Sequence, residues 1–195
     1  MLRDLRAAVV TLVLFTLILG LAYPLAVTAI GGALFPRQAG GSLVRDAKGQ
    51  VIGSALIAQG FARPEYLHPR PSAAGAGYDP MNSGGSNLGP LDPKLSDRVK
   101  TDASALAKDA GGRPIPADAV TTSGSGLDPD ISPENAHMQA PRIAAHRGVA
   151  PQVIEAVIAA ETRQPVLGFI GQPTVNVLAV NRALDERYPM AHPKA

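Results

Sequence analysis

The amino-acid sequence predicts an α+β protein: one N-terminal transmembrane helix followed by a small mixed extracytoplasmic domain with long Gly/Pro-rich loops. Three observations predict it. Residues 7–35 contain no charged side chain. Asp92-Pro93 and Ser132-Pro133 each combine a good N-cap residue with a proline at the first helical position. The 20 Gly and 18 Pro, with only 4% aromatic residues, favour short elements joined by shaped turns over a large packed core.

The uncharged run of residues 7–35 is long enough to cross a bilayer. As a helix it would reach roughly 40 Å, against a hydrocarbon core of about 30 Å, so it can span with tilt. A cleaved signal peptide is the alternative, because Arg3 and Arg6 form a short basic start and Val27 and Ala29 resemble a cleavage site. Signal peptides have an apolar stretch of only about 7–15 residues, so the length of this run favours a retained anchor.

Basic residues lie on both sides of the predicted span. Arg3 and Arg6 precede it, whereas Arg37, Arg45 and Lys48 follow it. The first group and the amino terminus favour an N-terminus inside the cell, and the second group opposes that orientation. We expect residues 1–6 to lie in the cytoplasm, residues 7–35 in the membrane and residues 36–195 outside.

Small residues and a proline within the span predict contact with another membrane helix. Pro24 has no N–H group, so a kink is expected there and the carbonyl of Gly20 needs another partner. Glycines let a second helix approach closely. The residues expected to take part in this packing are Gly20, Tyr23, Pro24 and Gly31.

Turn and capping residues divide the rest of the chain into short elements. A hairpin is expected over residues 42–59, with a turn from Asp46 to Gly49 and a second strand from Gln50 to Ile57. A helix opened by Asp92-Pro93 should end at Gly111. Apolar spacing predicts a helix from Pro151. Further expected elements are a short helix from Pro133 that Pro141 interrupts, another from Pro141 to Arg147 that Gly148 ends, a buried strand at residues 166–170, and a last helix capped by Thr174 and running to Tyr188.

Residues 60–90 form a stretch without any hydrophobic period. Pro, Gly, Ser and Asn dominate it, and a structureless loop of this length is uncommon in a compact domain. A flexible linker is one interpretation. The bulky residues Phe61, Tyr66, His68 and Tyr78 favour the other, an ordered loop shaped for a partner.

No motif in the sequence predicts catalysis. Gly84 and Gly89 have the spacing of a nucleotide-binding P-loop, but Pro90 stands where lysine is required. A nucleophile elbow needs glycines two residues before and two residues after its serine, but Ser123 and Leu127 occupy those positions around Ser125. The chain has no Cys, and its formal charge of +2 is too small and too evenly spread to predict a nucleic-acid surface.

The polar residues likewise give no metal-binding pattern. The histidines at positions 68, 137, 146 and 192 lack the spacing of a zinc site, so each is interpreted as a histidine with an ordinary hydrogen-bond partner. Asp128 and Asp130 flank Pro129, and a turn is favoured over a cation site because the rest of a calcium loop is missing. We therefore expect no metal and no firmly bound cofactor.

Four blocks of sequence resemble the C subunit of the Kdp-type potassium-transporting ATPase. They are GLAYPLAVTAI (residues 20–30), YLHPRPSAAGAGYDPMNSGGSNLGPLDPKL (66–95), ADAVTTSGSGLDPDISPENAHMQAPRIA (117–144) and LGFIGQPTVNVLAVNRAL (167–184). The blocks cover nearly the whole chain in order, which makes the resemblance specific.

The resemblance implies an accessory, non-catalytic subunit of an ATP-driven potassium importer in the bacterial inner membrane. Its implied partners are a channel-like potassium-translocating subunit, a P-type ATPase subunit and a small single-span subunit. It implies a role in assembly, and a catalytic-chaperone role in which the subunit raises the ATP affinity of the ATPase. ATP is thus implied only for the complex, potassium is the transported ion, and the domain would be periplasmic.

A loop and a turn are the candidate docking surface of such a subunit, because both combine shaped backbone with polar side chains. The residues expected at this surface are Tyr66, His68, Arg70, Tyr78, Ser83, Gly84, Gly85, Ser86, Asn87, Gly124, Ser125, Gly126 and Asp128. Two alternatives remain open from the residues alone: an anchored extracytoplasmic ligand-binding module, and a membrane-tethered hydrolase using Ser125 or His68.

Overall fold

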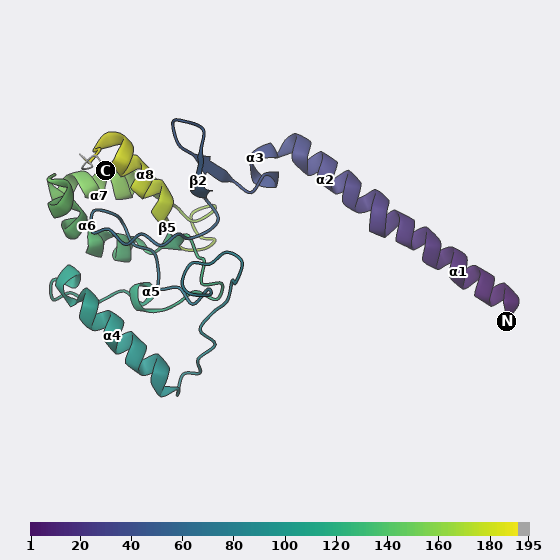
Figure 1. Ribbon diagram of the computed structural model, residues 1–195, viewed down its shortest axis with the longest axis horizontal. Coiled ribbons are helices and arrows are strands. Elements are labelled where there is room, and N and C mark those ends of the chain that lie inside the picture. Colours follow the sequence, from purple (N-terminus) through teal and green to yellow (C-terminus); the bar gives the residue numbers. More distant parts are fainter. Residues whose placement is uncertain (191–195) are drawn as a thin grey trace. The chain divides into compact units, whose positions relative to one another are not determined.

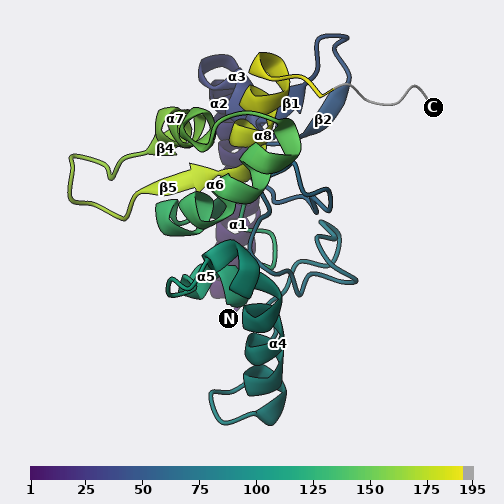
Figure 2. The ribbon, with the colours of Figure 1, turned by 90° about the vertical axis from the view of Figure 1, so that its left-hand side faces the viewer.

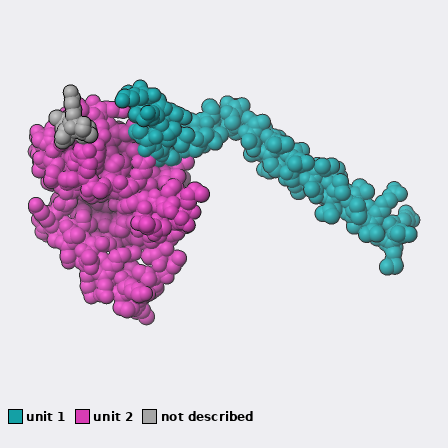
Figure 3. Space-filling model, viewed as in Figure 1, with its two compact units in different colours: residues 1–54 teal, residues 55–195 magenta. Residues whose placement is uncertain are grey.

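The computed structural model describes residues 1–190, which divide into two compact units. The first unit is Met1–Ser54 and the second is Ala55–Ala195 (Figure 3). The protein is a mixture of helices and short strands with one apolar helix at its N-terminus, as the composition predicts.

The first unit begins with one continuous helix, Leu2–Leu34, which is long and apolar enough to cross a membrane (Figure 1). It consists of α1 (Leu2–Leu17), a π-helical turn η1 (Ile18–Ala22) and α2 (Tyr23–Leu34). The π-turn ends two residues before Pro24, and Tyr23 N–H donates to Ile18 O across five residues. The helix therefore accommodates the missing N–H of Pro24 by a local widening.

A short helix and a hairpin complete the first unit. The helix α3 (Pro36–Ala39) leads to strands β1 (Leu43–Arg45) and β2 (Val51–Ser54), which pair antiparallel. The Asp46 carboxylate closes the turn by accepting hydrogen bonds from the backbone N–H groups of Lys48 (2.9 Å) and Gln50 (2.8 Å). The predicted hairpin is confirmed, with a second strand that ends at Ser54 instead of continuing to Ile57.

Three helices and a small sheet form the core of the second unit (Figure 1). The helices are α6 (Pro133–Arg147), α7 (Pro151–Glu161) and α8 (Val177–Arg187). The antiparallel sheet has the order β3-β5-β4, from β3 (Asp130–Ile131), β5 (Thr174–Asn176) and β4 (Thr162–Arg163). The fully buried side chains of this core include Ile143, Ile154, Ile158, Val175, Val180 and Leu184.

The helix α4 (Pro93–Ala110) is confirmed with both predicted ends. The Asp92 carboxylate accepts from Lys94 N–H at 2.9 Å, and Gly111 adopts the left-handed conformation that ends the helix. The C-terminal end of α4 packs with α5 (Ala117–Val120) and α6 around Met138. The rest of α4 extends away from the main core (Figure 2).

Pro141 does not interrupt a helix, so the prediction of two short helices is wrong. It lies inside the single helix α6, from the Ser132 cap to Gly148 in the left-handed conformation. An internal proline removes one backbone hydrogen bond and costs about 3 kcal/mol. Ala140, Ile143 and Ala144 are buried next to it, and this packing offsets the loss.

The predicted buried strand at residues 166–170 is also wrong. This segment is the exposed end of the hairpin that joins β4 to β5, with one isolated bridge between Val166 and Ile170. Leu167 and Gly168 both have positive φ, so the chain reverses where a strand would have to stay extended. The neighbouring prediction shifts too: Thr174 lies in β5, and the carboxamide of Asn176 caps α8 by accepting from Ala179 N–H at 3.1 Å.

Candidate functional site

The long segment of residues 55–92 contains no helix or strand and is nevertheless bound firmly to the core. Two carboxamides hold it. Asn181 on α8 accepts from Leu67 N–H at 2.8 Å and donates to Leu67 O at 2.9 Å. Gln139 on α6 accepts from His68 N–H at 2.9 Å and donates to His68 O at 3.1 Å. Each amide thus replaces a neighbouring strand for one residue of the loop, and Leu67 is fully buried between them.

A buried guanidinium holds the same segment at Glu65. The Arg147 side chain is fully buried and donates to Glu65 O (2.9 Å), Tyr188 O (3.0 Å) and the Asp185 carboxylate (2.8 Å). It lies 5.2 Å from the centre of the Tyr66 ring, and the Tyr66 hydroxyl donates to Asp185 at 3.0 Å. Burial and the Asp185 carboxylate raise the pKa of Tyr66, so this hydroxyl stays protonated.

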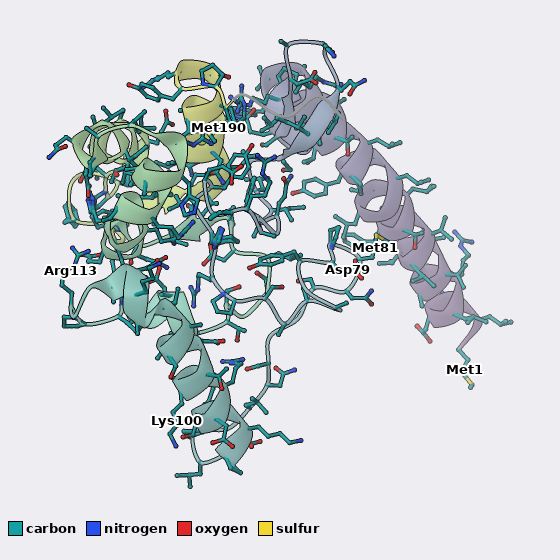
Figure 4. The ribbon with its side chains drawn as sticks, turned by 60° about the vertical axis from the view of Figure 1, so that its left-hand side comes forward. Met1, Asp79, Met81, Lys100, Arg113 and Met190 are labelled. Carbon is teal, nitrogen blue, oxygen red and sulfur yellow. The ribbon has the colours of Figure 1, made fainter. Side chains whose placement is uncertain are left out.

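Further along, Ser72 and Tyr78 hold the loop in shape. The Ser72 hydroxyl donates to Gly126 O at 2.7 Å and accepts from the backbone N–H groups of Ala74 and Tyr78. The Tyr78 hydroxyl donates to Arg70 O at 2.8 Å. The segment after Tyr78 reaches the surface at Met81, which is labelled in Figure 4 and is strongly exposed.

The loop and the turn of residues 124–128 are in direct contact. Gly84 N–H and the Ser83 hydroxyl both donate to Ser125 O, at 2.8 Å and 3.0 Å. Gly126 has φ +66°, and a Cβ atom there would lie 2.6 Å from Gly84 O and 2.7 Å from Ala74 N. Only glycine therefore allows the two segments to approach this closely.

Other residues of the contact lie closer to solvent. A Cβ atom on Gly85 would lie 3.1 Å from Gly124 O, a tight but smaller clash, whereas one on Gly124 would meet open space. Ser86 is half-buried, and Asn87 is exposed with φ +52°. We call the surface formed by residues 83–87 and 123–126 the loop–turn face.

A cleft of about 640 Å³ in the second unit is lined by Arg70 and several carboxylates. Arg70 and Asp128 form an ion pair across its edge at 3.1 Å. Asp118 accepts three hydrogen bonds from Ser132 and Asn135, so it stabilises the start of α6. The cleft's lining also includes Asp130, Glu134, Gln172, Pro173 and Thr174.

The predicted roles of the other polar residues are structural. The Asp128 carboxylate accepts from Asp130 N–H at 3.1 Å, the expected turn around Pro129. The Ser125 hydroxyl accepts from Leu127 N–H at 3.1 Å. Within residues 1–190, no group of three acidic, histidine or cysteine side chains could hold a metal ion.

The histidines within the described residues have the expected ordinary partners. The pairs are His68 Nε2 with Arg63 O at 3.0 Å, His137 with the Glu155 carboxylate, and His146 Nδ1 with Arg142 O at 2.9 Å. Burial lowers the pKa of His68, which keeps its imidazole neutral near pH 7. His192 lies outside the described residues.

Comparison with known proteins identifies the family. The family "KdpC: K+-transporting ATPase, c chain" matches residues 5–186. The chain belongs to this family. A potassium-transporting ATPase KdpC subunit from Caulobacter vibrioides strain NA1000 is 66% identical over 189 residues, covering 97% of this chain and 96% of the relative. KdpC subunits from Beijerinckia indica (54% over 195 residues; 99% and 98%) and Koribacter versatilis (47% over 192 residues; 98% and 99%) are also similar.

In this KdpC-family chain the residues expected at the docking surface fall into three groups. Tyr66 and His68 are bound to α6 and α8 and hold the loop to the core. Arg70, Tyr78 and Asp128 bond to one another, through the Tyr78 hydroxyl to Arg70 O and through the Arg70–Asp128 ion pair. The other expected residues lie on the loop–turn face. The residues expected to pack in the membrane lie on a helix without buried side chains: Tyr23 is exposed, and a Cβ atom on Gly31 would meet open space.

Three residues that hold the site together were not identified from the sequence: Asn181, Gln139 and Arg147. A signal for the first was present. Asn181 lies four residues after Val177 and three before Leu184, so it occupies an apolar stripe of α8. A polar residue inside such a stripe indicates a buried hydrogen-bond partner elsewhere in the chain.

Proposed function

We propose that this chain is the accessory subunit of a high-affinity, ATP-driven potassium import complex. In this role it is needed for assembly and acts as a catalytic chaperone that raises the ATP affinity of the P-type ATPase subunit. Its proposed partners are that subunit, a channel-like potassium-translocating subunit and a small single-span subunit. The observation that carries the proposal is the family match over residues 5–186 together with the long, similar KdpC relatives.

The proposed location is the bacterial inner membrane, with the N-terminus inside and the second unit on the outer face. The helix Leu2–Leu34 supports a single-pass anchor by its length and composition. Arg3 and Arg6 at its start support the orientation through the positive-inside rule.

The proposed docking surface is the loop–turn face, and the proposed partner there is the channel-like subunit. Backbone hydrogen bonds from Gly84 to Ser125 and side-chain bonds from Ser72 and Ser83 already fix its shape. A surface that is rigid before binding loses little conformational entropy in the complex. It also offers small polar side chains, which suit a closely fitting protein contact.

The proposed chaperone action is indirect. A domain outside the cytoplasm cannot touch cytoplasmic ATP, and the sequence has no phosphate-binding loop. The subunit would instead bias one of two states of its partners through the membrane helices or through the outer surface.

Co-purification from membranes in mild detergent, with a C-terminal tag on this chain, tests the proposal. The wild-type chain should recover a P-type ATPase and a channel-like subunit with potassium-stimulated ATP hydrolysis. Gly124→Arg should keep the fold, because that position meets open space, but should reduce recovery of the partners by about tenfold through bulk on the loop–turn face. Ala107→Arg, at an exposed position on α4, should leave recovery unchanged.

Two outcomes would contradict parts of this proposal. Recovery of the wild-type chain alone, under conditions that induce the pump, would overturn the accessory-subunit role. Full recovery with Gly124→Arg would overturn the loop–turn face as the docking surface while leaving the subunit role intact. The first outcome would favour an anchored ligand-binding module, for which the carboxylate-lined cleft beside Arg70 is the candidate site.

A further inference from the structure

The end of the β4–β5 hairpin is the most exposed group of large apolar side chains in the second unit. We call residues 166–170 the apolar tip. Its side chains are exposed to 66% (Val166), 79% (Leu167), 76% (Phe169) and 53% (Ile170). The hairpin projects beyond the helices and strands around it (Figure 2). Contiguous exposed apolar groups of this kind mark contact with a protein or a membrane.

Backbone hydrogen bonds hold the apolar tip in a defined conformation. Val166 N–H donates to Ile170 O at 3.1 Å, and Ile170 N–H donates to Val166 O at 2.9 Å. Gly168 N–H donates to Pro165 O at 3.0 Å, with Gly168 at φ +81°. The tip therefore presents its side chains in a fixed arrangement. Four of its backbone N–H groups, those of Val166, Gly168, Phe169 and Ile170, pair within the hairpin. This pairing lowers the cost of moving them into an apolar environment, which offers no water to replace those hydrogen bonds.

The hairpin also lacks charge. No charged residue occurs between Arg163 at its base and Arg182 on α8. A protein interface that relies on ion pairs for register is therefore not indicated here. The next strand, β5, is buried at Val175 and holds the hairpin firmly to the core.

The N-terminal membrane anchor indicates that a lipid bilayer is the partner that covers the apolar tip. The helix Leu2–Leu34 places a bilayer at the N-terminal end of the chain, and only residues 35–54 separate it from the second unit. A tether this short keeps a lipid surface at high effective concentration. Each large apolar side chain gains about 1.5–3 kcal/mol when fully buried, and Phe and Leu are residues that enter the interface between headgroups and acyl chains.

We propose that the apolar tip inserts into the interfacial region of the same bilayer that holds the N-terminal helix. The second unit would then have two attachments to the membrane: the N-terminal helix, to which the chain links it, and the reversibly inserted apolar tip. Two attachments fix the orientation of a domain, whereas one tether leaves it free to rotate. The inference rests on the membrane anchor and does not depend on the proposed role in a potassium pump.

A fluorescence experiment on the full chain tests this proposal directly, because the natural chain has no cysteine. Ile170→Cys would be labelled with an environment-sensitive fluorophore and reconstituted, without partner subunits, into phosphatidylcholine vesicles with brominated acyl chains. Brominated lipid should quench the label by about twofold or more compared with ordinary lipid. Leu91→Cys is the matched control, because Leu91 is 95% exposed but isolated, and its label should not be quenched.

A second variant separates insertion of the tip from attraction of the fluorophore to lipid. Phe169→Asp in the labelled Ile170→Cys chain should abolish most of the quenching, since a carboxylate disfavours insertion, while circular dichroism stays unchanged. Equal quenching with and without the Phe169→Asp substitution would overturn the proposal. So would a label that stays exposed in vesicles and becomes protected only when the partner subunits are added, which would make the apolar tip a protein contact.

Discussion

The loop of residues 60–90 and the apolar tip of residues 166–170 each have the burial that their composition does not suggest. The loop is rich in Gly, Pro and Ser, yet Leu67 within it is fully buried and its backbone is bound to two helices. The tip is apolar, yet its side chains face solvent in the isolated chain. In these two segments, the polarity of the residues does not decide which segment is buried. The hydrogen-bond partners available to the backbone do so more closely.

The two regions satisfy their backbone in different ways. The backbone of the loop forms hydrogen bonds with side chains of two helices: Asn181 on α8, and Gln139 and Arg147 on α6. The tip pairs backbone with backbone within the hairpin, through the bridge between Val166 and Ile170 and the bond from Gly168 N–H to Pro165 O. Changes to the loop should therefore cost stability throughout the second unit, whereas changes to the tip should not.

The largest expected effect is at the contact between the loop and the turn. Gly126→Val places a branched side chain at φ +66° and within 2.7 Å of two backbone atoms that cannot move away freely. We expect a loss of roughly 3 kcal/mol or more in the free energy of unfolding. Urea denaturation of the detergent-solubilised chain, followed by circular dichroism, measures it.

Gly124→Val is the matched control, since a Cβ atom at that position meets open space. It should change the free energy of unfolding by no more than about 0.5 kcal/mol. Equal losses for the two variants would show that the close contact between the loop and the turn does not hold the loop in place.

The next effect concerns the carboxamide that supports Leu67. Asn181→Ala leaves Leu67 N–H and Leu67 O buried without their partner, and each unsatisfied group costs about 1–3 kcal/mol. We expect a loss of roughly 2–4 kcal/mol by the same denaturation measurement.

Asn82→Ala offers a comparison within the loop. Asn82 also donates a side-chain hydrogen bond, to Asp79 at 2.6 Å, but both residues are at the surface, where water can replace it. Its loss should be below about 1 kcal/mol. If Asn181→Ala were as mild, the loop would not depend on α8.

Local sequence signals predicted the elements whose causes are local. The caps at Asp92 and Ser132, the left-handed Gly111 and Gly148, and the turn at Asp46 all depend on residues within a few positions of one another. The physical causes of these features are short-range hydrogen bonds and backbone preferences, so a single sequence contains them.

The wrong predictions concern elements that tertiary structure decides. Pro141 lies in a continuous helix because buried neighbours on α6 offset the hydrogen bond that it removes. Residues 166–170 have the composition of a buried strand, but Leu167 and Gly168 reverse the chain. An apolar run of five residues does not specify which surface will cover it.

For a related reason, the sequence indicated the two segments that meet at the candidate site but not the residues that hold them in place. Glycines and serines spaced far apart in the chain indicated two shaped segments, and the structure brings Gly84 and Ser125 into contact. The residues that hold those segments were missed, because the sequence around Arg147 or Gln139 does not show whether the side chain is buried. Its burial depends on the distant segment that packs against it. That information is not local to either helix.

The smallest expected effect is at the apolar tip, where Phe169→Asp should change the free energy of unfolding by less than about 0.5 kcal/mol in detergent. The side chain is 76% exposed, so the carboxylate stays hydrated. Val175→Asp, only a few residues along the same hairpin, buries its charge in the core and should prevent folding. A large loss with Phe169→Asp would mean that the tip packs against the second unit, and its contrast with the loop would then disappear. A negligible loss, combined with reduced quenching by brominated lipid, would show that the apolar side chains of the tip serve a contact outside the folded domain.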